Sequence, residues 1–358
     1  MPDLKEKYEK DKDTWDECAA TYEKHIVGGH PDILAFENFE EDMLDRLLHH
    51  LAKTQNRPIK LMDIGCGSGR LHLRYGAKIT KLMSELQSDY QLAELKKSNQ
   101  DFAYDPLLAQ KLKEVWGIDF SMEMIRLAEA KLKDAGLGYQ RSVRMNFEQG
   151  SAFELKEEPK NILPVAICLV NSIGVMQGPE GAIELFKSMR RAVESAGGIA
   201  IISCYQQEYL ESYGLGQYES TLDVSGQPWW MEPETYASEK YKQIAREYKL
   251  ANSSNNNKLV VDVYDNQGFK IKDGHTLKRH PEKTALVLKT GQIKTFSNYE
   301  SNWYSFDHLD NLTNEFWGDN SYHFKTKQLD NLRAEPAQMA VFDGGNNLFE
   351  LFKNWGIC

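Results

Sequence analysis

The sequence predicts an α/β protein built on a seven-stranded, doubly wound sheet. Short apolar runs of strand length alternate with helix-period patterns between residues 59 and 203. The first apolar run ends in a glycine-rich turn, which is typical of a strand that leads into a ligand-binding loop. The chain has 358 residues, of which 41% are hydrophobic, so it is long enough to bury a large core.

Residues 1–57 are expected to form an N-terminal helical cap, helical over about residues 14–55. Apolar side chains recur there at helical spacing, at Phe36, Phe39, Met43, Leu44, Leu47 and Leu48. Pro58 interrupts this pattern, and the first strand is expected to begin at the next residue.

The first strand carries an acid, Asp63, near its end, and three glycines follow at alternate positions: Gly65, Gly67 and Gly69. Such a turn lets bare backbone approach a ligand, because a side chain there would hold the ligand away or forbid the turn. The spacing differs from the dinucleotide fingerprint G-x-G-x-x-G, whose third glycine would fall at Arg70. The sequence therefore disfavours a nicotinamide-dependent dehydrogenase.

The second strand is expected at residues 115–120 and contains a second acid, Asp119. In a compact unit this acid lies about 20 residues after the glycine turn. Here it lies about 50 residues after Gly69. The sequence therefore predicts a mostly helical insertion over about residues 76–113, after the first helix.

The remaining elements of the core, residues 58–204, follow in order. A helix is expected to start at the N-cap Ser121 and to end near Gly136. The third, fourth and fifth strands are expected at residues 142–147, 165–170 and 198–203, with a helix after Gly178. The fourth strand is apolar throughout, which is typical of a strand inside a parallel sheet. The alternation predicts a doubly wound parallel sheet.

The pattern changes after the fifth strand. Residues 205–303 are expected to form an α+β substrate lid, with antiparallel strands at residues 259–264, 285–289 and 292–296. The core is expected to return over residues 304–358, with a helix at 305–316 and the last two strands at 322–326 and 339–342.

The D-x-G-x-G-x-G pattern of residues 63–69 resembles motif I of the class I S-adenosylmethionine (SAM) methyltransferases, which have a Rossmann-like fold. The loop of residues 171–174, Asn-Ser-Ile-Gly, is similar to a loop of glycine, sarcosine and amino-sugar N-methyltransferases. Residues 15–22 are similar to a segment that folds over SAM. The resemblance covers the core and the N-terminal cap, but neither the insertion nor the lid, so it identifies the methyl donor and not the acceptor.

This resemblance implies SAM as the cofactor, S-adenosylhomocysteine (SAH) as its product, and no metal. Asp119 would accept both ribose hydroxyls, with Phe120 and Met122 near the adenine. Ser151 stands where the family commonly has an aspartate that accepts from the adenine amino group, and a hydroxyl is a weaker acceptor. The expected cofactor-binding residues are Asp63, Gly65, Cys66, Gly67, Gly69, Arg70, Asp119, Phe120, Met124, Ser151, Ala152, Phe153 and Asn171.

Methyl transfer needs few catalytic side chains, because the sulfonium is already a reactive donor. The enzyme must chiefly align the reactants and exclude water. Asn171 is expected to orient an amine or hydroxyl, and capping of the turn is an equally supported alternative. A general base is needed only if the nucleophile arrives protonated. Tyr22, His25, His30 and His72 are the candidates, although a structural role is favoured for each. Tyr22 would also close on the methionine end of SAM.

Composition narrows the function classes. The net charge of −10 argues against a broad nucleic-acid footprint and suits a cationic ligand such as a sulfonium. No apolar run reaches the length of a membrane span, and the first residues hold no apolar signal core. The five cysteines are scattered, as reduced thiols are. We therefore expect a cytoplasmic protein; its oligomeric state has no signal in the sequence.

The sequence thus predicts a SAM-dependent methyltransferase that acts on a nitrogen or oxygen of a small molecule by in-line displacement. Two alternatives stay open: the same enzyme acting on RNA or protein, and a non-catalytic binding protein with the same fold.

Overall fold

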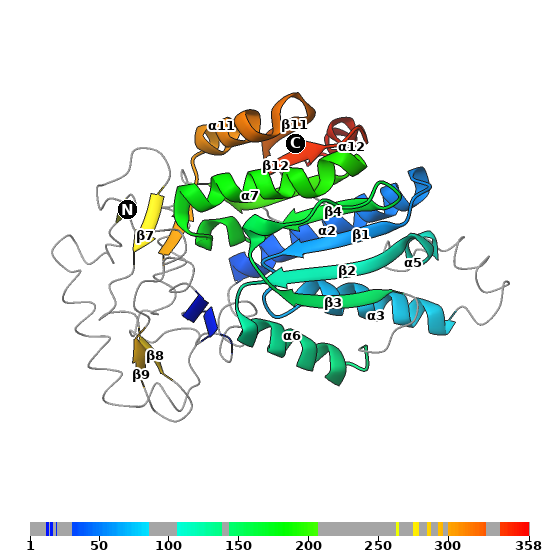
Figure 1. The fold of residues 1–358 in the computed structure, drawn as a ribbon, viewed down its shortest axis with the longest axis horizontal. Coiled ribbons are helices and arrows are strands. Elements are labelled where there is room, and N and C mark those ends of the chain that lie inside the picture. Colours follow the sequence, from blue (N-terminus) through cyan, green and yellow to red (C-terminus); the bar gives the residue numbers. More distant parts are fainter. Residues whose placement is uncertain are drawn as a thin grey trace.

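The computed structural model describes residues 12–13, 15–16, 19, 31–85, 106–137, 143–206, 263–264, 275–278, 285–287, 293–295, 300–326 and 337–357. Its centre is a seven-stranded sheet between layers of helices (Figure 1). The strands of this sheet are β1 Ile59–Ile64, β2 Leu112–Asp119, β3 Arg144–Gln149, β4 Leu163–Cys168, β5 Ile199–Tyr205, β11 Ser321–Lys325 and β12 Ala337–Asp343.

The strand order is β11-β12-β5-β4-β1-β2-β3. Strands β1 to β5 pair in parallel, whereas β12 is antiparallel to both of its neighbours. The expected seven strands with flanking helices are confirmed, and the five strands whose alternation with helices predicted a parallel sheet are parallel. Only residues 326–336 join β11 to β12, and a parallel crossover needs about a dozen residues or more.

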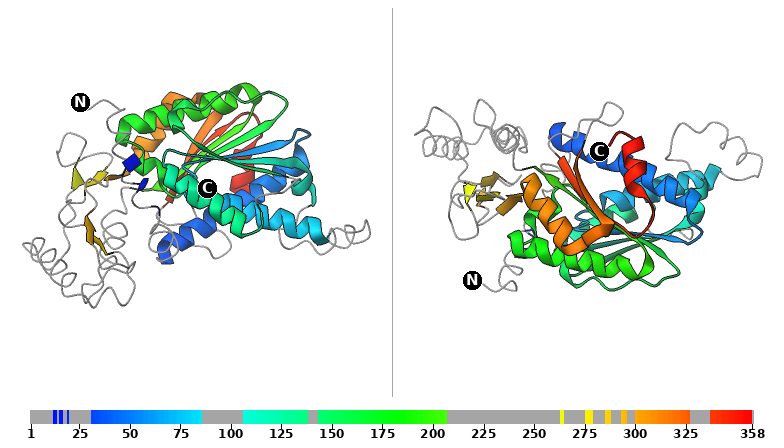
Figure 2. Two further views of the ribbon diagram at one scale, coloured as in Figure 1. Left: turned by 60° about the horizontal axis from the view of Figure 1, so that its bottom comes forward. Right: turned by 90° about the horizontal axis from the view of Figure 1, so that it is seen from above.

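Helices cover both faces of this sheet. In Figure 2, α2 and α12 lie on one side of it, and α7 and α11 lie on the other. The helices are α2 Pro31–Thr54, α3 Arg70–Glu85, α5 Pro106–Lys111, α6 Met122–Asp134, α7 Gly178–Val193, α11 Phe306–Trp317 and α12 Leu348–Asn354. In the part of the chain that the structure describes, none of them is both long and apolar enough to cross a membrane.

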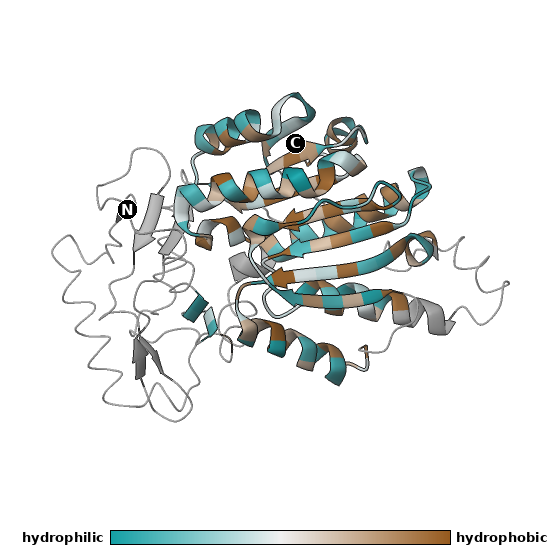
Figure 3. Ribbon diagram, viewed as in Figure 1, coloured by the Kyte–Doolittle hydropathy of each residue, from teal (hydrophilic) through white to brown (hydrophobic). Residues whose placement is uncertain are grey.

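The core consists of two apolar layers, one on each face of the sheet. Along β5, Ile199 and Ile201 join the layer under α2, α3 and α12, whereas Ala200 and Ile202 join the layer under α7 and α11. This alternation follows from the two-residue period of a strand. Figure 3 shows the strands as mostly hydrophobic and helices such as α7 as mixed, so each helix buries one stripe.

Two boundaries differ from those expected. Helix α3 continues to Glu85, so the first ten residues of the expected insertion, residues 76–85, belong to this helix. The buried residues Leu71, Tyr75 and Ile79 continue its apolar stripe at four-residue spacing. Strand β2 begins at Leu112 and takes up the end of the expected insertion. Residues 86–105 lie outside the described residues.

The chain leaves and re-enters this core at one place. Strand β5 ends at Tyr205, and the next residue, Gln206, pairs with Tyr304 in an isolated bridge. Between these points the structure describes β6 Val263–Tyr264, β7 His275–Lys278, β8 Ala285–Val287, β9 Ile293–Thr295 and β10 Glu300–Trp303. They pair antiparallel, as β10-β7-β6 and as β8-β9; β7 and β10 were not expected from the sequence.

An ionic ladder joins α2 to α3. The buried carboxylate of Asp45 accepts a hydrogen bond from Tyr75 Oη at 2.9 Å and pairs with Lys78 Nζ at 2.6 Å and with Arg74. Charge-assisted bonds of this kind are stronger than neutral ones, because one or both partners are ionised. The ladder fixes the cap helix α2 against the helix that follows the glycine turn.

We expect Asp45→Ala to lower the free energy of unfolding by about 2–4 kcal/mol, since it removes the shared acceptor and leaves Tyr75 Oη buried without this partner. Chemical denaturation followed by circular dichroism measures the change. Removing the exposed partner of Lys187 by Glu184→Ala should cost less than about 0.5 kcal/mol. Equal effects of the two substitutions would contradict a structural role of the ladder.

Candidate functional site

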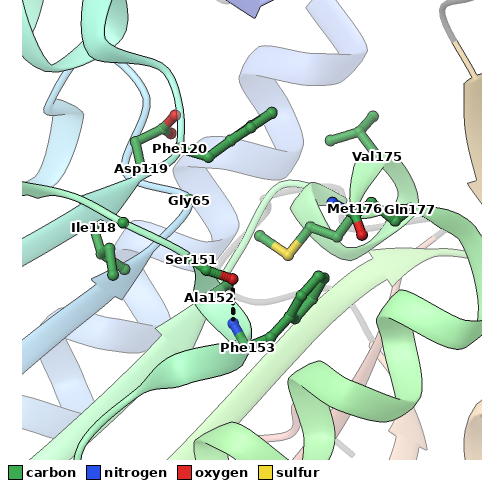
Figure 4. A pocket seen from close by; sticks show the side chains of 11 residues that line it. Gly65, Ile118, Asp119, Phe120, Ser151, Ala152, Phe153, Val175, Met176 and Gln177 are labelled. Atoms are coloured by element: carbon green, nitrogen blue, oxygen red, sulfur yellow. Dashed lines mark hydrogen bonds between the residues drawn. The ribbon is translucent and has the colours of Figure 1, made fainter. Parts of the chain in front are cut away.

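A pocket opens where the loops after β1, β2, β3 and β4 meet (Figure 4). From β1, strands β2 and β3 follow toward one edge of the sheet, whereas β4 and β5 lie toward the other edge. The strand order therefore reverses between β1 and β4. Ligands of open α/β sheets bind at such a reversal. The pocket is lined by Gly65, Ile118, Asp119, Phe120, Gly150, Ser151, Ala152, Phe153, Val175, Met176 and Gln177.

The glycine turn adopts a backbone that other residues rarely take. Gly65, Gly67 and Gly69 have φ of 77°, 50° and 79°. A Cβ at Gly69 would lie 2.9 Å from Cζ of Phe147, and one at Gly65 would lie 3.0 Å from Cε of Met176 in the pocket wall. Any larger residue would strain the turn, and at Gly65 it would also narrow the pocket.

Asp119 ties the turn to the next helix. Its Oδ2 accepts the Gly67 N–H at 2.9 Å and its Oδ1 accepts the Ser121 N–H at 2.9 Å. Burial raises the pKa of Asp119 to about 6, although these backbone bonds oppose the shift. Each carboxylate oxygen has a further lone pair, so the group also fits the hydroxyls of a ribose.

The N-terminal segment reaches the same place. Asp16 Oδ1 accepts from Ser121 Oγ at 2.5 Å and from the Glu123 N–H at 3.1 Å. A carboxylate is favourable at the first turn of a helix, here α6, because the free N–H groups point toward it. This contact places Asp16, which belongs to the segment that resembles a SAM-covering element, close to Asp119. Tyr22 and His25 lie outside the described residues, as does His30.

The pocket wall after β3 is a short 3-10 turn, Ala152–Glu154, held from α7. Ser151 Oγ caps it by accepting the Phe153 N–H at 3.2 Å. Arg191 donates to the carbonyl oxygens of Phe153 at 3.0 Å and Leu155 at 3.1 Å, and Ser188 Oγ accepts the Leu155 N–H at 3.0 Å. Two α7 side chains therefore set the position of this wall.

A second 3-10 turn, Ser172–Val175, follows β4 on a strained backbone. Val170 and Asn171 have φ of 51° and 58°, which is costly for a β-branched residue. The buried Glu40 of α2 accepts the Val170 N–H at 2.9 Å and also binds Ser203 Oγ. Asn171 Oδ1 accepts the Tyr205 N–H at 3.2 Å, so its side chain joins this loop to the end of β5 and makes no capping bond.

Carboxyl groups gather around Arg70, the first residue of α3. Arg70 pairs with Glu41 Oε1 at 3.0 Å and lies 3.6 Å from Glu40 Oε2. Burial raises the pKa of Asp63 to about 7, and it raises the pKa of Glu37 and of Glu40 to about 7 as well. Asp63, the acid of motif I, thus lies in a cluster in which several carboxyl groups surround the Arg70 guanidinium.

The structure brings together six of the expected cofactor residues on the pocket lining: Gly65, Asp119, Phe120, Ser151, Ala152 and Phe153. The other expected residues are not among its lining residues: Asp63 lies in β1, Cys66, Gly67 and Gly69 in the glycine turn, Arg70 at the start of α3, and Asn171 in the loop after β4. Met124 is buried in α6, and its N–H donates to Ser121 Oγ. His72 is buried, with Nε2 3.0 Å from the carbonyl oxygen of Asn146, and burial lowers its pKa to about 4.

Sequence reasoning missed the side of the pocket after β4, which consists of Val175, Met176 and Gln177. The sequence could have indicated these residues only by their position, because they follow the expected fourth strand and precede the helix start at Gly178. Within the described ranges, no group of three or more His, Cys, Asp or Glu side chains is arranged to hold a metal ion.

The model of the ubiE/COQ5 methyltransferase family matches residues 13–215. No curated protein matches the chain.

Solved structures with weak similarity include a SAM-dependent methyltransferase from Clostridium acetobutylicum, with 12% identity, a TM-score of 0.45, and coverage of 92% of this chain and 98% of that one. The magnesium protoporphyrin IX methyltransferase of Synechocystis with bound SAH has 12% identity, a TM-score of 0.39, and coverage of 92% and 91%. The CcbJ methyltransferase of Streptomyces caelestis has 12% identity, a TM-score of 0.39, and coverage of 88% and 97%. These similarities are too weak to assign an acceptor.

The family match spans more than half of the chain and includes the glycine turn, Asp119 and the loop after β4. The chain therefore belongs to the ubiE/COQ5 methyltransferase family, which confirms the expectation of a SAM-dependent methyltransferase with SAM as its cofactor.

Proposed function

We propose that this enzyme transfers the methyl group of SAM to a nitrogen or oxygen of a small-molecule acceptor by in-line displacement. The observation that carries the proposal is the pocket in which the glycine turn, Asp119 and the 3-10 turn Ala152–Glu154 meet. SAM supplies a methyl group already activated on a sulfonium. The residues of the chain must bind it, align the acceptor and exclude water.

The nucleoside half of SAM is assigned to this pocket. Asp119 would accept the ribose hydroxyls with the lone pairs that Gly67 and Ser121 leave available. The rings of Phe120 and Phe153 flank the pocket and offer apolar surface to a planar base (Figure 4). The carboxyl-rich cluster around Arg70 supports a cationic ligand beside the glycine turn.

The acceptor is assigned to the side of the loop after β4. Asn171 is fixed by the Tyr205 N–H, so its amide is a candidate to orient an amine or hydroxyl. We further propose that Tyr22 closes the site and that Tyr22 or His25 accepts a proton from the acceptor. A small acceptor is supported by the acidic chain, whose net charge is −10.

The buried free thiols Cys66, Cys168 and Cys204 support the cytoplasm as the compartment of the protein.

The direct test supplies the purified protein with methyl-labelled SAM and a panel of small amines and hydroxyl compounds, and measures SAH release and labelled product. Turnover with one class of small acceptor is the expected result. RNA binding at low salt, or methylation of RNA or protein with no small molecule accepted, would overturn the acceptor class.

Asp119→Ala should weaken SAH binding by more than about tenfold, because it removes an ionised acceptor for the ribose. Isothermal titration calorimetry measures the dissociation constant. Asp343→Ala is a matched control, since Asp343 also accepts backbone N–H groups, those of Gly345, Asn346 and Leu348, but at a turn far from the pocket lining. An unchanged constant for Asp119→Ala would show that the ribose assignment is wrong.

SAH binding should weaken as the pH falls through about 6. The ionised form of Asp119 accepts hydroxyl protons and the neutral form does so less well, and the pKa of this group without ligand is about 6. Protonation at low pH therefore competes with the ligand. Calorimetry between pH 5 and pH 8 measures the slope, and Asp119→Asn should flatten it. An equal slope in that variant would assign the titration to another group.

Replacing residues 207–303 by a short glycine-serine linker should leave SAH binding within about threefold of the original value and abolish turnover. The linker has little distance to span, because Gln206 and Tyr304 are bridge partners. Calorimetry and a product assay with the native acceptor measure the two effects. Retained turnover would remove this segment from the acceptor site.

A further inference from the structure

Gln177 combines two unusual features at the rim of the pocket. It is the N-cap residue of α7, it lines the pocket after β4, and its φ of 61° lies in the left-handed region. An unbranched, non-glycine residue pays free energy for this conformation, and such outliers gather at ligand sites. Its side chain makes no bond to the helix that it precedes.

The side-chain oxygen of Gln177 is buried, and no donor among the described residues reaches it. A buried acceptor without a hydrogen bond is costly, so most are satisfied by protein, water or ligand. The other side-chain oxygens of the pocket lining each have a protein donor: Ser151 Oγ accepts the Phe153 N–H, and the two oxygens of Asp119 accept one backbone N–H each. Gln177 Oε1 therefore identifies a place for a ligand donor.

The position of Gln177 limits which donor this can be. Figure 4 shows Asp119 and Gln177 on opposite sides of the pocket, with Phe120, Met176 and Phe153 between them. In the proposed binding mode, with the ribose hydroxyls at Asp119, the base would extend across the pocket toward Gln177. The exocyclic amino group is the only N–H donor of adenine in SAM, since its ring nitrogens are acceptors.

We propose that Gln177 Oε1 accepts a hydrogen bond from the exocyclic amino group of adenine, and so supplies the acceptor that Ser151 provides only weakly at its own position. This inference rests on the proposed SAM site. It assigns base recognition to the loop after β4 instead of the loop after β3. Gln177 lines the pocket from this left-handed backbone (Figure 4).

The test compares SAH with its analogue in which hydrogen replaces the adenine amino group. Gln177→Met keeps the length of the side chain and removes the amide, and Gln177→Asn keeps a residue that tolerates the left-handed conformation but shortens the reach. Both variants should bind SAH about 3- to 10-fold more weakly and bind the analogue as the original protein does. Calorimetry measures the constants, and thermal unfolding checks that each variant is folded.

Gln55→Met is the matched control, because Gln55 pairs with Asn346 Oδ1 at 3.1 Å away from the pocket lining. It should leave the binding of both ligands unchanged. Unchanged SAH binding in the Gln177 variants, or an equal loss for SAH and the analogue, would overturn the adenine contact. Failure of the unmodified protein to bind SAH would instead reject the proposed function itself.

Discussion

The buried carboxylate of Asp119 sets the geometry on which the pocket depends. It accepts one N–H group from the glycine turn after β1 and one from the start of α6 after β2, so a single side chain fixes two loops. Backbone donors leave little freedom, because moving either loop breaks a bond that water would have to replace. Asp16 adds a third chain segment at the same helix start. The pocket is therefore organised before a ligand arrives.

Helix α2 stabilises the other side of the site at an electrostatic cost. Glu40 is buried with its pKa raised to about 7, yet it is the residue that holds the left-handed turn at Val170 and reaches Ser203 and Arg70. An apolar residue would avoid the desolvation but would leave the Val170 N–H without this acceptor. The cap helix thus connects motif I, the loop after β4 and β5 through one carboxyl group.

The elements predicted well are those with a local signal. The glycine turn, the Ser121 cap and the apolar strand β4 each follow from period or turn chemistry. The direction of β12 and the length of α3 depend on packing between distant segments. Glu40 gives no local signal of its role, since an acid within a helical stripe is usually solvated. Gln177 was missed because a neutral amide in a loop carries no pattern until the pocket around it is known.

The junction at which Gln206 and Tyr304 pair also bears on how such an enzyme can diversify. Gln338 of β12 donates to the carbonyl oxygens of Tyr205 and Tyr304, and Gln206 donates to that of Ala337, so both junctions are fastened to the sheet itself. A segment inserted between them can change in length and sequence while the junctions stay paired. Under the proposed function, acceptor preference can therefore change with this segment alone, while the SAM-binding half is inherited unaltered.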